Sequence, residues 1–317
     1  MQYFSAEQIA RQIPMARAIE LMREAFSQIS DRSARVPVRT HVHMPESEAQ
    51  ALFMPVSLAR SQSFGLKLVG INDRNLERGL PYIHAQIILA DAQTGQLQAV
   101  MEGGYITALR TGAASGLATD LLALPQADSL AIFGAGRQAW PQVHAVSVVR
   151  PLKKVWVVNR NPERGERLCK HIEKKLQIEA SPAKAREALA QASIVCTATT
   201  SSEPLFPPEW VQPGTHINAI GAYRPDMAEL PLALLKQAHL YLDETKAAWT
   251  EAGLLIQARK AGIITARTPK GELGEILLGR IAGRTSEGTI TVFKSVGNAA
   301  QDLIVAEEMV RLHEPQP

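Results

Sequence analysis

Asp128-Ser-Leu-Ala-Ile-Phe133 is an apolar segment that runs directly into the glycine turn Gly134-Ala-Gly136-Arg-Gln-Ala139. The turn has the G-x-G-x-x-A spacing of a dinucleotide-binding fingerprint. Gly134 permits a tight turn, Gly136 lets the backbone approach a pyrophosphate, and Ala139 lets the next helix pack close to the strand. The free N–H groups at the start of that helix would face the phosphates. A second strand, Val155-Trp-Val-Val158, follows at the expected distance, so the stretch predicts a dinucleotide-binding domain.

From residue 128 onward, apolar segments alternate with helical ones, which is typical of a parallel, doubly wound sheet. The expected strands are 129–133, 154–159, 193–198, 215–220, 239–243 and 289–293. More than a hundred residues precede the fingerprint, enough for a separate domain that could supply the substrate site. The predicted fold class is therefore α/β: a Rossmann-type doubly wound parallel sheet plus a smaller α+β domain.

The part of the chain before the fingerprint has a different pattern. Residues 5–30 predict a helix pair, with a capping box at Ser5-Ala-Glu-Gln8 and a break at Ile13-Pro14. A largely antiparallel sheet and a helix of small residues should follow, and the terminal segment from Asn298 reads as an amphipathic helix that returns to the first domain. The expected strands are 36–43, 51–56, 64–70 and 82–90, and the small-residue helix covers 106–120. We expect one domain over 1–118 and 298–317, and the dinucleotide-binding domain over 119–297.

Composition excludes several classes of protein. The chain has 317 residues, 46% of them hydrophobic and 21% charged, and a formal net charge of only +3. Basic residues are dispersed, so we expect no nucleic-acid partner, and no apolar run approaches membrane-spanning length. Cys169 and Cys196 are too few and too far apart for a disulfide framework, and the N-terminus does not resemble a signal peptide. A cytoplasmic location fits best.

The end of the second strand bears on the choice of dinucleotide. NAD-binding folds usually place Asp or Glu there to hold the ribose hydroxyls. Here the strand ends Val158-Asn159-Arg160-Asn161, with no carboxylate at the tip and with Arg160 placed to meet a 2′-phosphate. This favours NADPH, with NADH possible. Alternatively, Arg160 is a solvated loop residue and the selectivity is loose.

Four basic residues of the first domain lie on otherwise apolar elements: Arg39, Lys67, His84 and Arg110. A buried cation needs an anion, and a substrate carboxylate would serve. Alternatively, the four residues form internal salt bridges. Arg offers a bidentate fork, while the pKa of a buried Lys falls when other cations are near. A metal site at His41 and His43 would need further ligands that the sequence does not reveal, so we predict none.

With these residues assembled, the chain resembles the ornithine cyclodeaminase/mu-crystallin family over essentially its whole length. The matching stretches are Gly65-Leu-Lys-Leu-Val-Gly-Ile-Asn72, Leu89-Ala-Asp-Ala-Gln-Thr-Gly95, Ile106-Thr-Ala-Leu-Arg-Thr-Gly-Ala-Ala114, Gly134-Ala-Gly-Arg-Gln-Ala139, Gly271-Glu-Leu-Gly-Glu275 and Val292-Phe-Lys-Ser-Val-Gly-Asn298. The resemblance implies a homodimer whose first domains join their sheets, and a carboxylate pocket facing the nicotinamide. It gives Arg39, Lys67 and Arg110 substrate-binding roles. Cofactor contacts are implied for Thr111, Gly134, Gly136, Arg137, Gln138, Asn159, Arg160, Ser295 and Val296.

Departures from the family pattern narrow the chemistry. Cyclodeaminases and the related archaeal alanine dehydrogenases carry an aspartate where this chain has Tyr223, and mu-crystallin-like ketimine reductases lack it. Asp226 lies three residues further on and is not given the cyclodeaminase role. The Asn159-Arg160 ending also resembles the NADPH-using members. Both departures favour reduction over cyclodeamination.

We therefore expect an NADPH-preferring reductase of small cyclic imino-acid carboxylates. The best candidate substrate is Δ1-pyrroline-2-carboxylate, giving L-proline, and Δ1-piperideine-2-carboxylate, giving L-pipecolate, comes second. Lys67, a bound water or His84 could supply the proton, and an iminium formed in solution would need no enzymic acid. Three alternatives stay open: an ornithine cyclodeaminase, an amino-acid dehydrogenase of the alanine type, and a mu-crystallin-like protein that binds NADPH and a ligand without turnover.

Overall fold

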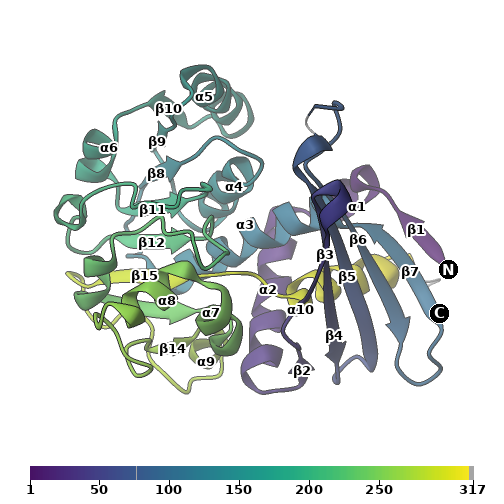
Figure 1. Ribbon diagram of the computed structural model, residues 1–317. Coiled ribbons are helices and arrows are strands. Elements are labelled where there is room, and N and C mark those ends of the chain that lie inside the picture. The colour runs from purple at the N-terminus through teal and green to yellow at the C-terminus, as the bar shows by residue number, and fades with distance from the viewer. Residues whose placement is uncertain (76, 314–317) are drawn as a thin grey trace. The chain divides into compact units, whose positions relative to one another are not determined.

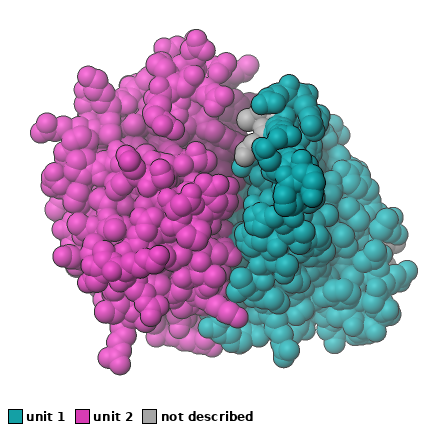
Figure 2. Space-filling view, in the orientation of Figure 1, with its two compact units in different colours: residues 1–110, 298–317 teal, residues 111–297 magenta. Residues whose placement is uncertain are grey.

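The computed structural model describes residues 1–75 and 77–313, and it divides into two compact units (Figure 2). Unit 1 comprises Met1–Arg110 and the segment that begins at Asn298, and unit 2 comprises Thr111–Gly297. The chain passes from unit 1 to unit 2 inside helix α3 (Gly103–Leu122), eight residues before the expected boundary after residue 118. The chain returns to unit 1 at Asn298.

Unit 1 is built on a seven-stranded sheet with the order β1-β7-β6-β5-β4-β2, and β3 pairs with β4 (Figure 1). Every described pairing in it is antiparallel except that of β1 with β7, so the expected antiparallel sheet is confirmed. The expected strand over 36–43 begins too early, because regular pairing starts only at Thr40. The strands are β1 (Gln2–Phe4), β2 (Ala34–Arg35), β3 (Thr40–Met44), β4 (Ala49–Leu58), β5 (Ser63–Asn72), β6 (Ile83–Asp91) and β7 (Leu97–Glu102).

The helices of unit 1 cover one face of this sheet. Helix α10 (Ala299–Arg311) packs on β4 to β7 and on α2 (Met15–Ser30), and α1 (Ala6–Gln12) begins with the expected capping box at Ser5. Gly65 in β5 allows the close approach of α10, because a Cβ there would lie 2.4 Å from Leu303 Cδ1. Two short 3-10 turns complete the unit, η1 (Pro45–Ser47) and η2 (Asp73–Asn75).

Unit 2 contains an eight-stranded sheet with the order β10-β9-β8-β11-β12-β15-β13-β14, and every pairing in it is parallel. The chain reverses its direction of winding between β8 and β11, where doubly wound folds bind ligands at the carboxyl ends of the strands. This confirms the predicted Rossmann-type sheet. The strands are β8 (Ser129–Phe133), β9 (Lys154–Val158), β10 (Glu179–Pro182), β11 (Ile194–Thr197), β12 (His216–Ala219), β13 (Ala238–Leu242), β14 (Gly271–Glu272) and β15 (Ile290–Lys294).

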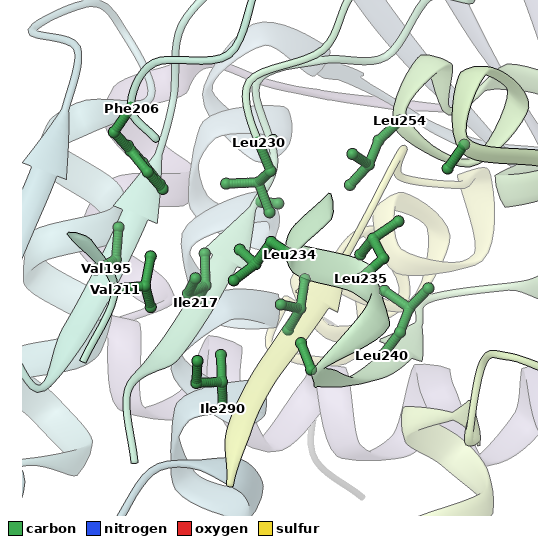
Figure 3. Packing of buried hydrophobic residues seen from close by; sticks show 14 of the residues in the cluster. Val195, Phe206, Val211, Ile217, Leu230, Leu234, Leu235, Leu240, Leu254 and Ile290 are labelled. Carbon is green, nitrogen blue, oxygen red and sulfur yellow. The ribbon is translucent and has the colours of Figure 1, made fainter. Parts of the chain in front are cut away.

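Both faces of this sheet are covered, which explains why its strands are continuously apolar. In β8, Ala131 and Phe133 join the core on one face, which Figure 3 shows in part, while Leu130 and Ile132 join the core on the other. The connecting helices are α4 (Ala139–Val149), α5 (Pro162–Leu176), α6 (Ala185–Gln191), α7 (Thr245–Glu251), α8 (Gly253–Lys260) and α9 (Leu273–Leu277), with 3-10 turns η3 (Pro208–Trp210) and η4 (Leu232–Lys236). Within residues 1–75 and 77–313, no helix is both long enough and apolar enough to cross a bilayer.

Candidate active site

The glycine turn after β8 has the backbone geometry that its sequence predicts. Gly134 has a φ of +103°, and a Cβ on it would lie 2.6 Å from the carbonyl oxygen of Ala198. Gly136 is exposed, and a Cβ on it would meet no atom within 4 Å. Ala139 is fully buried at the start of α4. The turn is therefore closed on its protein side and open on its outer side, as backbone contact with a pyrophosphate requires.

Residues at the start of α4 fit a phosphate group. Arg137 is exposed, and no side chain caps the helix at Gln138. The expected row of free N–H groups is reduced, because the Ala139 N–H donates to the Gly136 carbonyl oxygen at 3.0 Å and Pro141 has no N–H. The buried Oε1 of Gln138 has no hydrogen-bond partner among the described residues. Thr111 is buried in unit 2, where its carbonyl oxygen accepts a hydrogen bond of 3.2 Å from Gln142 Nε2 of α4. The exposed guanidinium of Arg137 and the uncapped start of α4 could hold the phosphates of a dinucleotide.

Asn159 and Arg160 follow β9 and have different roles. The Asn159 side chain accepts from the Ala135 N–H at 3.2 Å and donates to the Asn161 carbonyl at 2.7 Å, so it ties the glycine turn to the second strand. The Arg160 side chain is exposed. The ribose end of the predicted cofactor site thus presents a cation and an amide, with no carboxylate at the strand tip.

A buried carboxylate, Asp243, shapes the loop that follows β15. Its Oδ2 accepts hydrogen bonds from the Ser295 hydroxyl at 2.7 Å, from the Val296 N–H at 2.9 Å and from the Gly297 N–H at 2.7 Å. The neighbouring Lys294 donates to the carbonyl oxygens of Ala219, Ala222 and Ser295. Burial lowers the pKa of Lys294 to about 8, and Glu229 and Asp243 oppose that shift. Ser295 and Val296 are therefore held by residues that sequence reasoning missed.

Glu229 is a second organising carboxylate of unit 2, and it is almost fully buried. It accepts from the Thr197 hydroxyl at 2.9 Å and from the Thr199 N–H and hydroxyl at 2.7 and 2.8 Å. It also accepts from the N–H groups of Gly221 at 2.8 Å and Ala222 at 3.1 Å. One side chain thereby fixes the loops at the carboxyl ends of β11 and β12, the edge at which doubly wound sheets bind their ligands.

Three predicted substrate residues, Arg39, Lys67 and Arg110, belong to unit 1, where Asp302 joins them. Asp302 Oδ1 lies 2.9 Å from Lys67 Nζ and 3.2 Å from Arg110 Nε, and Arg110 Nη1 donates to Gln301 Oε1 at 2.8 Å. Lys67, Arg110 and Asp302 are all buried. Lys67 and Arg110 carry two positive charges, and Asp302 supplies one negative charge to them. These three side chains together therefore retain a positive charge.

Burial is the main reason why the pKa of Lys67 falls from 10.5 to about 8. Arg110 and Arg39 lower that pKa further by repulsion, while Asp302 opposes the shift by attraction and by its hydrogen bond. Arg39 lies half-buried just before β3 and is close enough to contribute to this field. Lys67 is thus an ammonium at neutral pH that gives up its proton readily, which suits a proton donor.

His84 does not join the cluster. It lies opposite Gly70 in the pairing of β5 with β6, whereas Lys67 lies opposite Ile87. Since side chains alternate between faces along a strand, His84 points to the other side of the sheet from Lys67, and it is exposed. Asp226 is exposed as well and forms an ion pair with its neighbour Arg224. Among the described residues, no group of three or more His, Cys, Asp or Glu side chains could hold a metal ion.

A model of the ornithine cyclodeaminase/mu-crystallin family matches residues 2–313. A Delta(1)-pyrroline-2-carboxylate reductase of Bacillus cereus is 38% identical over 309 residues, which are 97% of this chain and 95% of the relative. The structure of Thermococcus litoralis Delta(1)-pyrroline-2-carboxylate reductase in complex with NADH and L-proline has a TM-score of 0.93 at 36% identity, covering 98% of this chain and 97% of that one. An archaeal alanine dehydrogenase dimer with bound NAD has a TM-score of 0.92 at 32% identity, covering 98% and 95% of the respective chains.

Proposed function

The chain belongs to the ornithine cyclodeaminase/mu-crystallin family, and from that premise we propose that it reduces small cyclic imino acids with a nicotinamide cofactor. Δ1-Pyrroline-2-carboxylate, giving L-proline, is the first substrate proposed, and Δ1-piperideine-2-carboxylate, giving L-pipecolate, is the second. One observation carries the proposal: Lys67 and Arg110 share one oxygen of Asp302 in a buried cluster with Arg39 nearby. Such a cluster suits a carboxylate whose ring nitrogen needs a proton.

In this proposal Arg39 and Arg110 hold the substrate carboxylate, which lowers the entropic part of the barrier. Lys67 gives one proton to the imine nitrogen, so that the C=N carbon becomes electrophilic, and later regains a proton from water. The bound reduced cofactor supplies the hydride that this carbon accepts. One imine, one proton and one hydride give one amine. His84 is left out of the mechanism, because it lies on the other face of the sheet.

Cyclodeamination receives no support from the site. Tyr223 stands where we align the family's aspartate, and Asp226 is exposed and paired with Arg224. Asp226 would have to break that pair and bring its charge to the substrate.

The deciding experiment follows the oxidation of NADPH and NADH with each of the two imines. Turnover of either imine is the expected result. The absence of turnover with both would refute the proposal. Ammonia release from ornithine with NAD would then identify a cyclodeaminase, and ammonia-dependent turnover of pyruvate an alanine-type dehydrogenase. NADPH binding without any turnover would identify a binding protein.

We further propose that NADPH is preferred, with NADH as the poorer donor, because Arg160 is exposed at the tip of β9 with no carboxylate beside it. Changing Arg160→Asp should lower the ratio of kcat/KM for NADPH to that for NADH about 10- to 100-fold, the effect of losing a charge-assisted hydrogen bond to a 2′-phosphate. Arg164→Asp makes the same charge change at an exposed position of α5 and is the control. An unchanged ratio in Arg160→Asp would show that Arg160 does not select the cofactor.

We also propose a homodimer formed through the face of the unit 1 sheet opposite α2 and α10. Phe64, Val42 and Leu97 on that face are 41%, 44% and 46% exposed, and Leu66 lies between them in β5. Leu66→Lys would place a charge in the centre of this apolar face, where burying it is costly. We expect a monomer in sedimentation velocity at micromolar concentration. Gln191→Lys, on the exposed surface of α6, should remain a dimer; a dimeric Leu66→Lys protein would rule out this face.

The location that we propose is the cytoplasm. Cys169 and Cys196 are both free thiols buried in unit 2, and burial raises the pKa of Cys196 to about 12. Such thiols are compatible with a reducing compartment.

A further inference from the structure

Asp302 lies on α10, in the centre of the cation cluster, and one of its two oxygens makes all of its described contacts. Oδ1 faces both Lys67 Nζ and Arg110 Nε, while Oδ2 is buried without a hydrogen-bond partner among the described residues. The adjacent Gln301 repeats this arrangement, because its Oε1 accepts from Arg110 and its buried Nε2 has no described partner.

We propose that Asp302 is a positioning residue for imine reduction, whose Oδ1 holds the Lys67 ammonium and the Arg110 guanidinium side by side in the arrangement that the substrate needs. The inference rests on the proposed function, and it adds a residue that contacts the cations rather than the substrate.

The incomplete pairing of the Asp302 carboxylate indicates that its role is not only to stabilise the fold. A buried ion pair adds little to stability, because desolvation of the charges offsets their attraction unless all the remaining lone pairs are satisfied. Glu308, on the same helix, meets that condition: its Oε1 accepts from Arg17 and Arg311, and its Oε2 accepts from Arg311. Asp302 does not meet it. A half-paired buried carboxylate is what we expect where function, rather than stability, determines the residue.

The surroundings of Lys67 show what the Asp302 charge does. Arg110 on α3 and Arg39 before β3 repel the ammonium, and Asp302 on α10 attracts it. The cross-strand neighbours of Lys67, Met54 on β4 and Ile87 on β6, are apolar. Without Asp302, the repulsion of the Lys67 ammonium by Arg110 and Arg39 would lose the attraction that opposes it. Lys67 would then lose its proton at a lower pH. The side chains of Lys67 and Arg110, which Asp302 Oδ1 now holds together, would move apart.

The test is the isosteric change Asp302→Asn, with kcat/KM for Δ1-pyrroline-2-carboxylate measured as a function of pH. The wild-type profile should fall above about pH 8, where Lys67 deprotonates. In the variant this falling limb should move to lower pH by about 1 to 3 units, the usual effect of losing an adjacent opposite charge. Asp302→Glu should restore the limb. Glu308→Gln removes another buried carboxylate of α10 and should leave the limb in place.

A second readout does not depend on turnover. In protein labelled with 13C at lysine Cε, the resonance missing from Lys67→Met identifies Lys67, and its titration gives the pKa directly. A lower Lys67 pKa in Asp302→Asn, together with the shifted limb, supports the proposal. An unchanged Lys67 titration overturns it, and so does a changed titration with an unmoved limb. Wild-type protein without imine turnover would instead refute the proposed function, and the NMR comparison would still show whether Asp302 sets the protonation of Lys67.

Discussion

Lys67→Met is expected to lower kcat/KM for imine reduction by about three orders of magnitude, the middle of the range that a positioned proton donor contributes. Methionine keeps much of the length and the apolar stem of lysine, so the buried strand β5 should keep its packing. The variant loses the ammonium that Asp302 Oδ1 holds at 2.9 Å and leaves Arg110 as the partner of that oxygen. NADPH binding should remain nearly intact, because Lys67 is not one of the predicted cofactor residues. Steady-state kinetics and a fluorescence titration with NADPH measure the two quantities.

Lys154→Met is the matched control for this change. Lys154 is a partly buried lysine at the start of β9, paired with Glu179, and it lies outside both predicted sites. Its loss should leave imine reduction close to wild type. If Lys67→Met kept more than about a tenth of the wild-type kcat/KM, Lys67 could not be the proton donor, since that role contributes at least about a hundredfold. The proton would then come from water or from an iminium formed in solution.

The Rossmann-type sheet is predictable from the sequence because two local patterns occur together: continuous apolar strands and a glycine turn directly after one of them. Its central strands are buried on both faces and are therefore continuous apolar runs, and the glycine turn follows β8 directly. Strands β10 and β14 were missed for the converse reason. β10 is an edge strand that reads Glu179-Ala-Ser-Pro182, and β14 has only two residues, so neither contains an apolar run. Edge pairing tolerates Pro182 because a strand at the edge pairs on one side only.

Asp302 shows where single-sequence reasoning about a site stops. The sequence predicts an amphipathic helix for the terminal segment and gives Asp302 no role. The helix forms in unit 1, but α10 is buried on nearly every side, and Asp302 lies in the cluster with Lys67 and Arg110. Its partner Lys67 lies 235 residues away in the sequence. The sequence offers one indication of Asp302: an unpaired ammonium at Lys67 would be costly to bury. That cost predicts an acidic partner for Lys67 without saying which residue it is.

His84 was grouped with Lys67 because both lie in apolar strands of the first domain. Their faces depend on the register of β5 against β6, in which Gly70 lies opposite His84. Lys67 and Gly70 are three residues apart, an odd number, so His84 and Lys67 lie on opposite faces. A register shifted by one residue would have placed both side chains on one face. The sequence predicts the two strands but not the register of β5 against β6, and that register decides whether His84 and Lys67 share a face.

Glu229→Ala is expected to have the largest effect on stability, lowering the free energy of unfolding of unit 2 by at least about 4 kcal/mol. The Glu229 carboxylate accepts five hydrogen bonds from residues 197, 199, 221 and 222, three of them from backbone N–H groups. Each buried donor left unpaired costs about 1 to 3 kcal/mol. The negative charge also offsets the buried Lys294 ammonium. Calorimetry should show the thermal midpoint of unit 2 reduced by about 8 °C or more.

Two further variants separate the charge of Glu229 from its shape. Glu229→Gln keeps the volume and one acceptor oxygen, but its NH2 group must face donors that the carboxylate accepted, so its loss of stability should be intermediate. Glu203→Ala removes an exposed carboxylate from the adjacent loop and should change stability by less than about 0.5 kcal/mol. NADPH affinity should fall in the order of the stability losses, because the loops after β11 and β12 lie at the ligand-binding edge of the sheet. A Glu229→Ala protein that unfolds at the wild-type temperature would show that these loops hold their form without the carboxylate.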